Sequence, residues 1–414
     1  MIPGQTGTGT DPQDLPASTA AAAVEADADA DARPPWRLPW ALLIALAGGL
    51  LLAAAFPPYG GWPLAFVSPA LLIVALHRRS LRASFLIGLV FGVAFFTPLL
   101  AWVINLAWFA WVALAIASAL IFAVFTIAQR LLLNLRWWPL AVAGWWVAAE
   151  AFRDRWPWGG FPWGRLAMSQ AGIPTQGWAA IAGPPTLSLM VALAAASLGW
   201  LLLSALGWTD ARGGADGRIG RLNQGLGPRR RRLVAPALAV AGSAALAFLP
   251  GLLPLDPVPA GSATATVAAI QGNVPRARSL SGQLNADWVV TLNHVAATDK
   301  LADQVAAGKA AKPDLVIWPE NSTDIDPLVY PPVYQEIESA AAAIGEPILV
   351  GAVLQNPELN AGVLWLPGKG PTTVYAKRRL VPFGEYVPFR SLIDRKSTRL
   401  NSSHRLLSRM PSSA

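Results

Sequence analysis

Three ionisable side chains in the last third of the chain have types and spacing suited to acid–base chemistry. Glu320 follows Pro319 at the end of the apolar run "DLVIW", and Lys377 and Glu385 both lie in "YAKRRLVPFGEYVP", residues 375–388. A positioned carboxylate can accept a proton, and an ammonium can stabilise a developing oxyanion. A Glu after a strand is also common in solvated loops, and Lys377 and Glu385 could form a surface ion pair. From the residues alone, both interpretations stay open.

Lysine is scarce in this sequence, which makes Lys377 notable. The chain has 26 Arg and 6 Lys, and no Lys precedes Lys300. A guanidinium is bulky and always charged, whereas an ammonium is compact and its pKa shifts readily. The choice of Lys beside Arg378 and Arg379 therefore hints at a requirement that Arg does not meet.

The composition indicates a membrane protein. Of 414 residues, 54% are hydrophobic and 14% are charged, with a mean hydropathy of +0.43. A soluble protein usually has about a quarter charged residues. The net charge of +8 comes from Arg clusters beside apolar runs, which argues against nucleic-acid binding. With no Cys and three dispersed His residues, we expect no metal centre and no cofactor.

The first two thirds of the chain divide into a tail and a membrane domain. Residues 1–35 are rich in Ala, Asp and Pro without apolar periodicity, and we expect a disordered tail. Residues 36–256 are expected to form a transmembrane domain of about seven helices, near 38–56, 62–76, 84–104, 108–128, 137–152, 176–206 and 233–253. Seven spans would place every Arg cluster on the cytoplasmic side and the following domain outside the cytoplasm.

Residues 262–393 have a different pattern, typical of an α/β domain. Short β-rich runs such as "PDLVIWPE" and "EPILVGAV" alternate with helical segments such as "VYQEIESAAAAI". Alternating strands and helices favour a layered sheet.

Three motifs together give a resemblance to a known family. "IQGNVP" (270–275), "VIWPEN" (316–321) and "YAKRRLVPFGEYVPFR" (375–390) follow a multi-span domain whose loop contains "GGFPWG" (159–164). This arrangement resembles the bacterial apolipoprotein N-acyltransferases, membrane members of the nitrilase or carbon-nitrogen hydrolase superfamily. The resemblance implies a polytopic α-helical membrane domain followed by a nitrilase-like αββα sandwich domain, here incomplete.

The resemblance also implies an activity and roles for particular residues. Glu320 would be the general base, Lys377 would stabilise the oxyanion, and Glu385 would be a further glutamate near the lysine. Phe161 and Trp163 are candidates for the lipid entrance, although interfacial aromatic belts are a common alternative. Gln271 and Asn273 are candidates for substrate contact, although a tight turn explains them equally well.

The implied reaction transfers an acyl chain from a phospholipid to the N-terminal α-amine of a diacylglyceryl-cysteine apolipoprotein, through a Cys thioester. The implied location is the bacterial cytoplasmic (inner) membrane, with the catalytic domain on the periplasmic side of a monomer. A membrane-anchored nitrilase-like amidase and a non-enzymatic transporter or binding protein remain alternatives. Few charges lie within the expected spans, which speaks against a transporter.

The family's third catalytic residue, a Cys beyond Lys377, is absent from this sequence. Residues 394–414 begin with "DRKSTRLNSSH", which resembles a translated sequencing adapter, and the apolar pattern stops after Ile393. We therefore expect these residues not to belong to the protein and the chain as written to be inactive.

Overall fold

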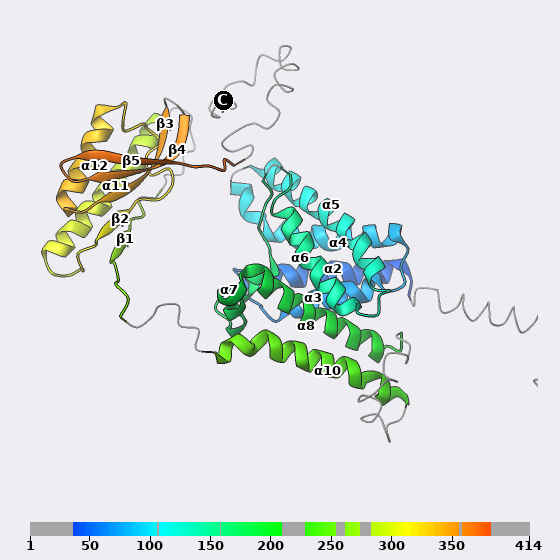
Figure 1. The fold of residues 1–414 in the computed structure, drawn as a ribbon. Coiled ribbons are helices and arrows are strands. Elements are labelled where there is room, and N and C mark those ends of the chain that lie inside the picture. The colour runs from blue at the N-terminus through cyan, green and yellow to red at the C-terminus, as the bar shows by residue number, and fades with distance from the viewer. Residues whose placement is uncertain are drawn as a thin grey trace, which may run out of the picture. The chain divides into compact units, whose positions relative to one another are not determined.

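The computed structural model describes residues 36–105, 107–157, 159–208, 228–253, 261–273, 283–355 and 358–381. The chain divides into two compact units, residues 1–257 and 258–414. The first is helical and the second contains a sheet (Figure 1).

Apolar helices make up the first unit, and they fall on the segments expected from the sequence. The helices are α2 (Leu38–Ala54), α3 (Leu64–Leu76), α4 (Leu81–Leu99), α5 (Trp108–Leu132), α6 (Trp138–Arg153), α7 (Gly177–Ala182), α8 (Pro184–Ala205) and α10 (Pro228–Phe248). Short 3₁₀ helices lie at Ala101–Asn105, Leu166–Gln170, Pro174–Gln176 and Leu249–Leu252.

Among the described residues of this unit, four helical segments are long and apolar enough to cross a membrane: Leu81–Leu99, Trp108–Leu132, Pro184–Ala205 and Arg232–Leu252. Helices α2 and α3 are apolar but shorter. The long segment expected at 176–206 is broken at Gly183, which has a φ of +84° and precedes two prolines. A proline at the start of a helix is tolerated because its missing N–H would be unpaired there. The break therefore separates α7 from a single span-length helix, α8.

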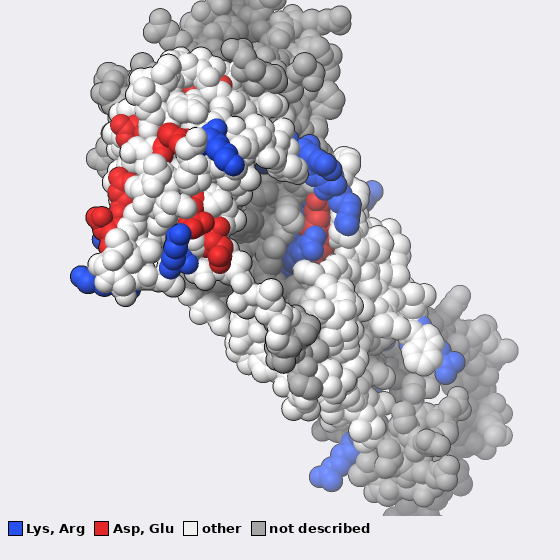
Figure 2. All heavy atoms as spheres, turned by 60° about the vertical axis from the view of Figure 1, so that its left-hand side comes forward, with Lys and Arg blue, Asp and Glu red and all other residues white. Residues whose placement is uncertain are grey.

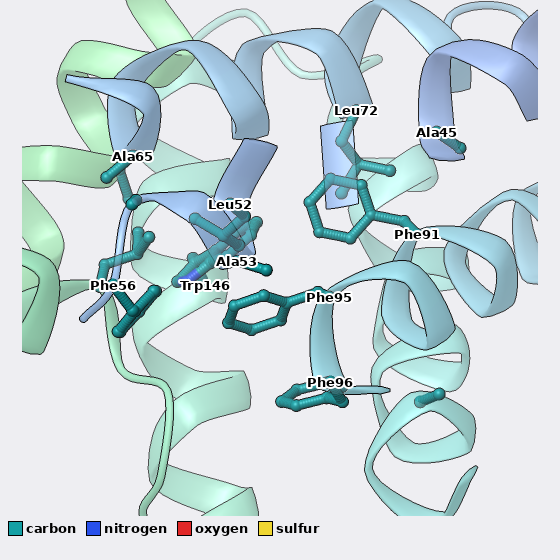
Figure 3. Packing of buried hydrophobic residues seen from close by; sticks show 14 of the residues in the cluster. Ala45, Leu52, Ala53, Phe56, Ala65, Leu72, Phe91, Phe95, Phe96 and Trp146 are labelled. Atoms are coloured by element: carbon teal, nitrogen blue, oxygen red, sulfur yellow. The ribbon is translucent and has the colours of Figure 1, made fainter. Parts of the chain in front are cut away.

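Small residues allow the membrane helices to pack closely. A Cβ on Gly92 of α4 would lie 2.9 Å from the Cα of Ala119 on α5, and a Cβ on Gly49 of α2 would lie 2.3 Å from the carbonyl oxygen of Phe91. Close backbone approach of this kind is typical of helix pairs in membranes. Aromatic rings fill the neighbouring space, where Phe91, Phe95 and other buried side chains interleave (Figure 3).

The second unit is a mixed five-stranded sheet in the order β1-β2-β3-β4-β5. Strands β1 (Val267–Ala269), β2 (Leu315–Ile317) and β3 (Ile348–Gln355) are parallel neighbours. β4 (Glu358–Leu366) and β5 (Gly370–Ala376) continue the sheet in antiparallel pairing. Helices α11 (Gln283–Ala306) and α12 (Pro331–Ile344) are the crossovers that parallel strands require.

The core of this unit lies between the sheet and its helices. Residues of β3 alternate, and Ile348, Val350 and Ala352 are buried in the cluster that includes Ile337 of α12. Because side chains alternate along a strand, Leu349 and Gly351 face the opposite side of the sheet. That side positions the candidate site. Most acidic side chains visible in Figure 2 lie on this unit rather than on the apolar helical unit.

Candidate active site

Glu320 is held at the end of β2 by a turn that is fastened to β3. The backbone N–H of Trp318 donates to the Leu349 carbonyl at 2.9 Å, and the N–H and hydroxyl of Ser322 both donate to the Gly351 carbonyl at 2.9 Å. Between them, Asn321 has a φ of +55°, a conformation that Asn adopts more readily than most residues. The turn therefore fixes the direction in which Glu320 leaves the sheet.

Gly351 is what lets this turn approach β3. A Cβ at Gly351 would lie 2.2 Å from the carbonyl oxygen of Pro319 and 2.8 Å from the Cα of Glu320. Both contacts are shorter than real Cβ atoms make, and both involve backbone, which cannot move aside cheaply. The position of Glu320 therefore depends on a glycine in the neighbouring strand.

Lys377 meets Glu320 across the sheet. Its backbone N–H donates to the Asn360 carbonyl at 2.8 Å, which fixes the residue just past the end of β5. Its Nζ donates to Oε1 of Glu320 at 2.8 Å, although 57 residues separate the two in the sequence. The side chains of Glu320 and Lys377 are 58% and 30% exposed, so the pair opens to the surface of the described unit. The structure thus brings together two of the three predicted catalytic residues.

Asn360 is a third member of the cluster that the sequence did not indicate. Its Nδ2 donates to the same oxygen, Oε1 of Glu320, at 2.5 Å. Asn360 lies on β4 opposite Val353 of β3, one strand away from Lys377. A polar residue in the otherwise apolar run "NAGVLWL" was the available signal, but only the strand register places it against Glu320.

A cavity of about 560 Å³ surrounds this cluster. Its lining contains apolar, cationic and glycine residues: Trp318, Glu320, Leu349, Gly351, Asn360, Ala361, Gly362, Tyr375, Lys377, Arg378 and Arg379. The volume falls in the usual range for small-molecule sites, roughly 300–1,000 Å³. A carboxylate, an ammonium and an amide that converge in a partly apolar cavity can activate a nucleophile and stabilise an oxyanion.

Other candidate residues lie elsewhere. Gln271 and Asn273 follow β1 and are exposed, and Asn273 has a φ of +62°. The cavity lining among the described residues does not include them, and substrate contact stays a prediction. Glu385 lies outside the described residues.

Phe161 and Trp163 belong to the helical unit, in the loop after α6. Their rings lie 6.0 Å apart, and Trp163 is 5.2 Å from Trp102 and 44% exposed. The buried Arg153 holds this loop by donating to the carbonyl oxygens of Phe161 and Trp163. Buried Glu150 accepts from the Leu166 N–H at 2.8 Å at the loop's other end. Arg153 and Glu150 of α6 therefore both bind the backbone of the loop that contains Phe161 and Trp163, called the aromatic loop below.

An apolar helical unit with membrane-length helices, followed by an α/β unit with a Glu–Lys–Asn cluster, defines a membrane protein with an attached α/β domain. Residues 48–197 match the family model described as the apolipoprotein N-acyltransferase N-terminal domain. The helical unit is therefore similar to the N-terminal domain of the apolipoprotein N-acyltransferases.

Curated relatives agree with this similarity and extend the match beyond the helical unit. An apolipoprotein N-acyltransferase of Mycolicibacterium smegmatis is 39% identical over 376 residues, covering 86% of this chain and 60% of that protein. One from Azotobacter vinelandii is 32% identical, covering 85% and 65%, and one from Vibrio vulnificus is 27% identical, covering 83% and 65%. The chain thus spans about 60–65% of the length of these relatives.

Proposed function

We propose that this protein transfers an acyl chain from a phospholipid to the N-terminal α-amine of a diacylglyceryl-cysteine apolipoprotein. The observation that carries the proposal is the 2.8 Å contact between Lys377 Nζ and Glu320 Oε1 at the wall of the cavity. The names of the relatives, each an apolipoprotein N-acyltransferase, supply the reaction class.

In the proposed reaction, a Cys thiol gives its proton to the Glu320 carboxylate and attacks the ester carbonyl of the phospholipid. The Lys377 ammonium stabilises the tetrahedral oxyanion, which collapses to a thioester as the lysophospholipid leaves with a proton. The lipoprotein α-amine then attacks the thioester carbonyl. The carbon–sulfur bond breaks, the amide forms, and the thiol regains a proton. Asn360 keeps Oε1 of Glu320 in place throughout.

The given sequence has no Cys. We propose that the source gene continues differently after codon 393 and encodes the Cys nucleophile. Residues 394–414 would then be a translated adapter, and Glu385 would lie beside Lys377. The chain as written would lack transfer activity.

We further propose that the α/β unit is one half of a nitrilase-like αββα sandwich. The described residues contribute one sheet, with helices on the face that buries Val350 and Ile337. On the opposite face, which includes Leu349 and Gly351, Tyr375 of β5 is 59% exposed. An open apolar sheet face of this kind is suited to packing against a second sheet.

The proposed location is the bacterial inner membrane, with the α/β domain on the periplasmic side. The Arg clusters beside the apolar segments support this orientation. Phospholipid and lipidated apolipoprotein would both reach the site from the membrane. The aromatic loop of Phe161 and Trp163 is our candidate for the lipid entrance.

A transfer assay tests the proposal. Cells express the gene with its own sequence after codon 393, up to its natural stop codon. Membranes from these cells are mixed with phospholipid and a diacylglyceryl lipopeptide, and conversion of the lipopeptide to the triacylated product is measured. We expect conversion by the parent protein and loss of at least about 100-fold in Glu320→Gln. Glu346→Gln, which breaks a surface ion pair with Lys312 at 2.7 Å, is the matched control and should retain activity. Release of free fatty acid without lipopeptide acylation would instead indicate a hydrolase.

A further inference from the structure

Two cationic residues line the cavity beside Glu320 in addition to Lys377, which contacts Glu320. Within the ranges that the structure describes, no carboxylate lies within ion-pair distance of Arg378 or Arg379. Two guanidinium groups in the lining of the cavity are therefore available to an anion.

Backbone and ring contacts place these two groups. They directly follow Lys377, whose N–H donates to the Asn360 carbonyl of β4. The Arg378 guanidinium lies 6.0 Å from the ring centroid of Tyr375, another lining residue. Guanidinium groups bind phosphate oxygens in pairs of parallel hydrogen bonds, which an ammonium cannot do.

Apolar residues also line the cavity. They are Trp318, Leu349 and Ala361, and the glycines Gly351 and Gly362 lie among them in the lining. A cavity lined by both apolar and cationic residues fits an amphiphile that joins a hydrocarbon part to an anionic group. Inorganic phosphate would use only the cationic residues.

We propose that Arg378 and Arg379 form a subsite for the phosphate of the acyl-donor phospholipid. This inference rests on the proposed function and adds what recognises the donor. Arg378 and Arg379 directly follow Lys377, which is proposed to face the ester carbonyl, and all three residues line the same cavity. In a glycerophospholipid the glycerol carbons join the phosphate to the acyl ester, so the two groups must be recognised side by side.

A binding measurement tests the subsite without requiring turnover. The full chain in detergent is titrated against short-chain phosphatidylglycerol and against a diacylglycerol with the same fluorescent acyl chain, and anisotropy gives each Kd. In the double variant Arg378→Gln/Arg379→Gln, we expect the Kd for phosphatidylglycerol to rise about tenfold or more, because two charge-assisted contacts are lost. The Kd for diacylglycerol should change less than about twofold.

The control variant, Lys309→Gln/Lys369→Gln, removes two exposed cations of the same unit outside the cavity lining and should leave both Kd values unchanged. An unchanged Kd for phosphatidylglycerol in the Arg variant, or an equal rise for both lipids, would overturn the proposal. Competition with inorganic phosphate separates the two phosphate sources. If it displaces the phospholipid at similar concentration with the same dependence on the arginines, free phosphate is the ligand and the lipid assignment fails. The Kd values do not depend on turnover. The test of the phosphate subsite therefore remains valid even if the transfer assay detects no product.

Discussion

At the scale of single residues, the site depends on one carboxylate oxygen. Oε1 of Glu320 accepts hydrogen bonds from Lys377 Nζ at 2.8 Å and from Asn360 Nδ2 at 2.5 Å. A carboxylate held by two donors from neighbouring strands has a defined orientation, which general-base catalysis requires. Lys377 is proposed to act on the reacting atoms, whereas Asn360 is a positioning residue.

Lys377→Arg should reduce acyl-enzyme formation although it keeps the charge. A planar guanidinium is larger than an ammonium and cannot occupy the same position between Glu320 and an oxyanion. We expect a decrease of about 100-fold in the single-turnover rate of the gene product read past codon 393. Lys369→Arg, at the exposed β4–β5 turn, is the control and should match the parent. Equal rates in both variants would refute the role of Lys377.

The substitution Asn360→Leu tests whether Asn360 orients the Glu320 carboxylate or binds the substrate. The substitution removes the Nδ2 donor to Oε1 of Glu320, while the Nζ donor of Lys377 remains. We expect kcat to fall about tenfold with KM for the phospholipid nearly unchanged, because a misoriented base slows chemistry more than it weakens binding. A rise in KM at constant kcat would show that Asn360 binds substrate instead.

At the scale of elements, two glycines that face each other on β3 and β4 make a matched test. Gly351 and Gly362 are register partners and both line the cavity. A Cβ on Gly351 would collide with the backbone of Pro319, whereas a Cβ on Gly362 would meet a Leu349 methyl at 3.4 Å, an ordinary contact. Gly351→Ala should therefore lower turnover at least about tenfold, and Gly362→Ala should change it less than twofold. Similar effects of both, measured by the transfer assay, would mean that the turn of Glu320 does not depend on this approach.

Helix α11 should become less stable in acid because of His294. This side chain is 2% exposed and lies against Trp318, with ring centroids 5.5 Å apart. Burial lowers the pKa of His294 below its ordinary value of 6.5, while the carbonyl of Val290 opposes the shift. Below pH 6.5 the His294 side chain takes up a proton in the unfolded state but not in the folded state. The free energy of unfolding therefore decreases as the pH is lowered, by at most about 1.4 kcal/mol per pH unit.

Hydrogen exchange of the α11 peptides, corrected for intrinsic rates, checks this expectation between pH 7.5 and pH 5. Protection should decrease toward pH 5 in the parent and much less in His294→Gln. An equal decrease in both would assign the pH dependence to other groups.

At the scale of the whole molecule, the elements follow from the sequence more readily than their contacts do. Apolar length indicated the helical segments, and alternation with turn residues indicated the five strands. The break at Gly183 was missed because apolar composition continues across it, although the following prolines were a local signal. The motif resemblance implied separate roles for Glu320 and Lys377 in one site, but the direct contact between their side chains was not predicted. Asn360 was not predicted either, because its position depends on the register of β4, which no local pattern encodes.

The central claim is that a Cys of the gene product forms a thioester with the acyl chain of a phospholipid and that Glu320 is the general base for this step. The most direct measurement is the intact mass of the gene product, read past codon 393, after incubation with phospholipid and no acceptor. We predict a gain of one acyl chain that hydroxylamine removes, present in the parent and in Glu346→Gln but absent in Glu320→Gln. An unmodified parent protein, or an acyl adduct that forms equally in Glu320→Gln, would contradict the account.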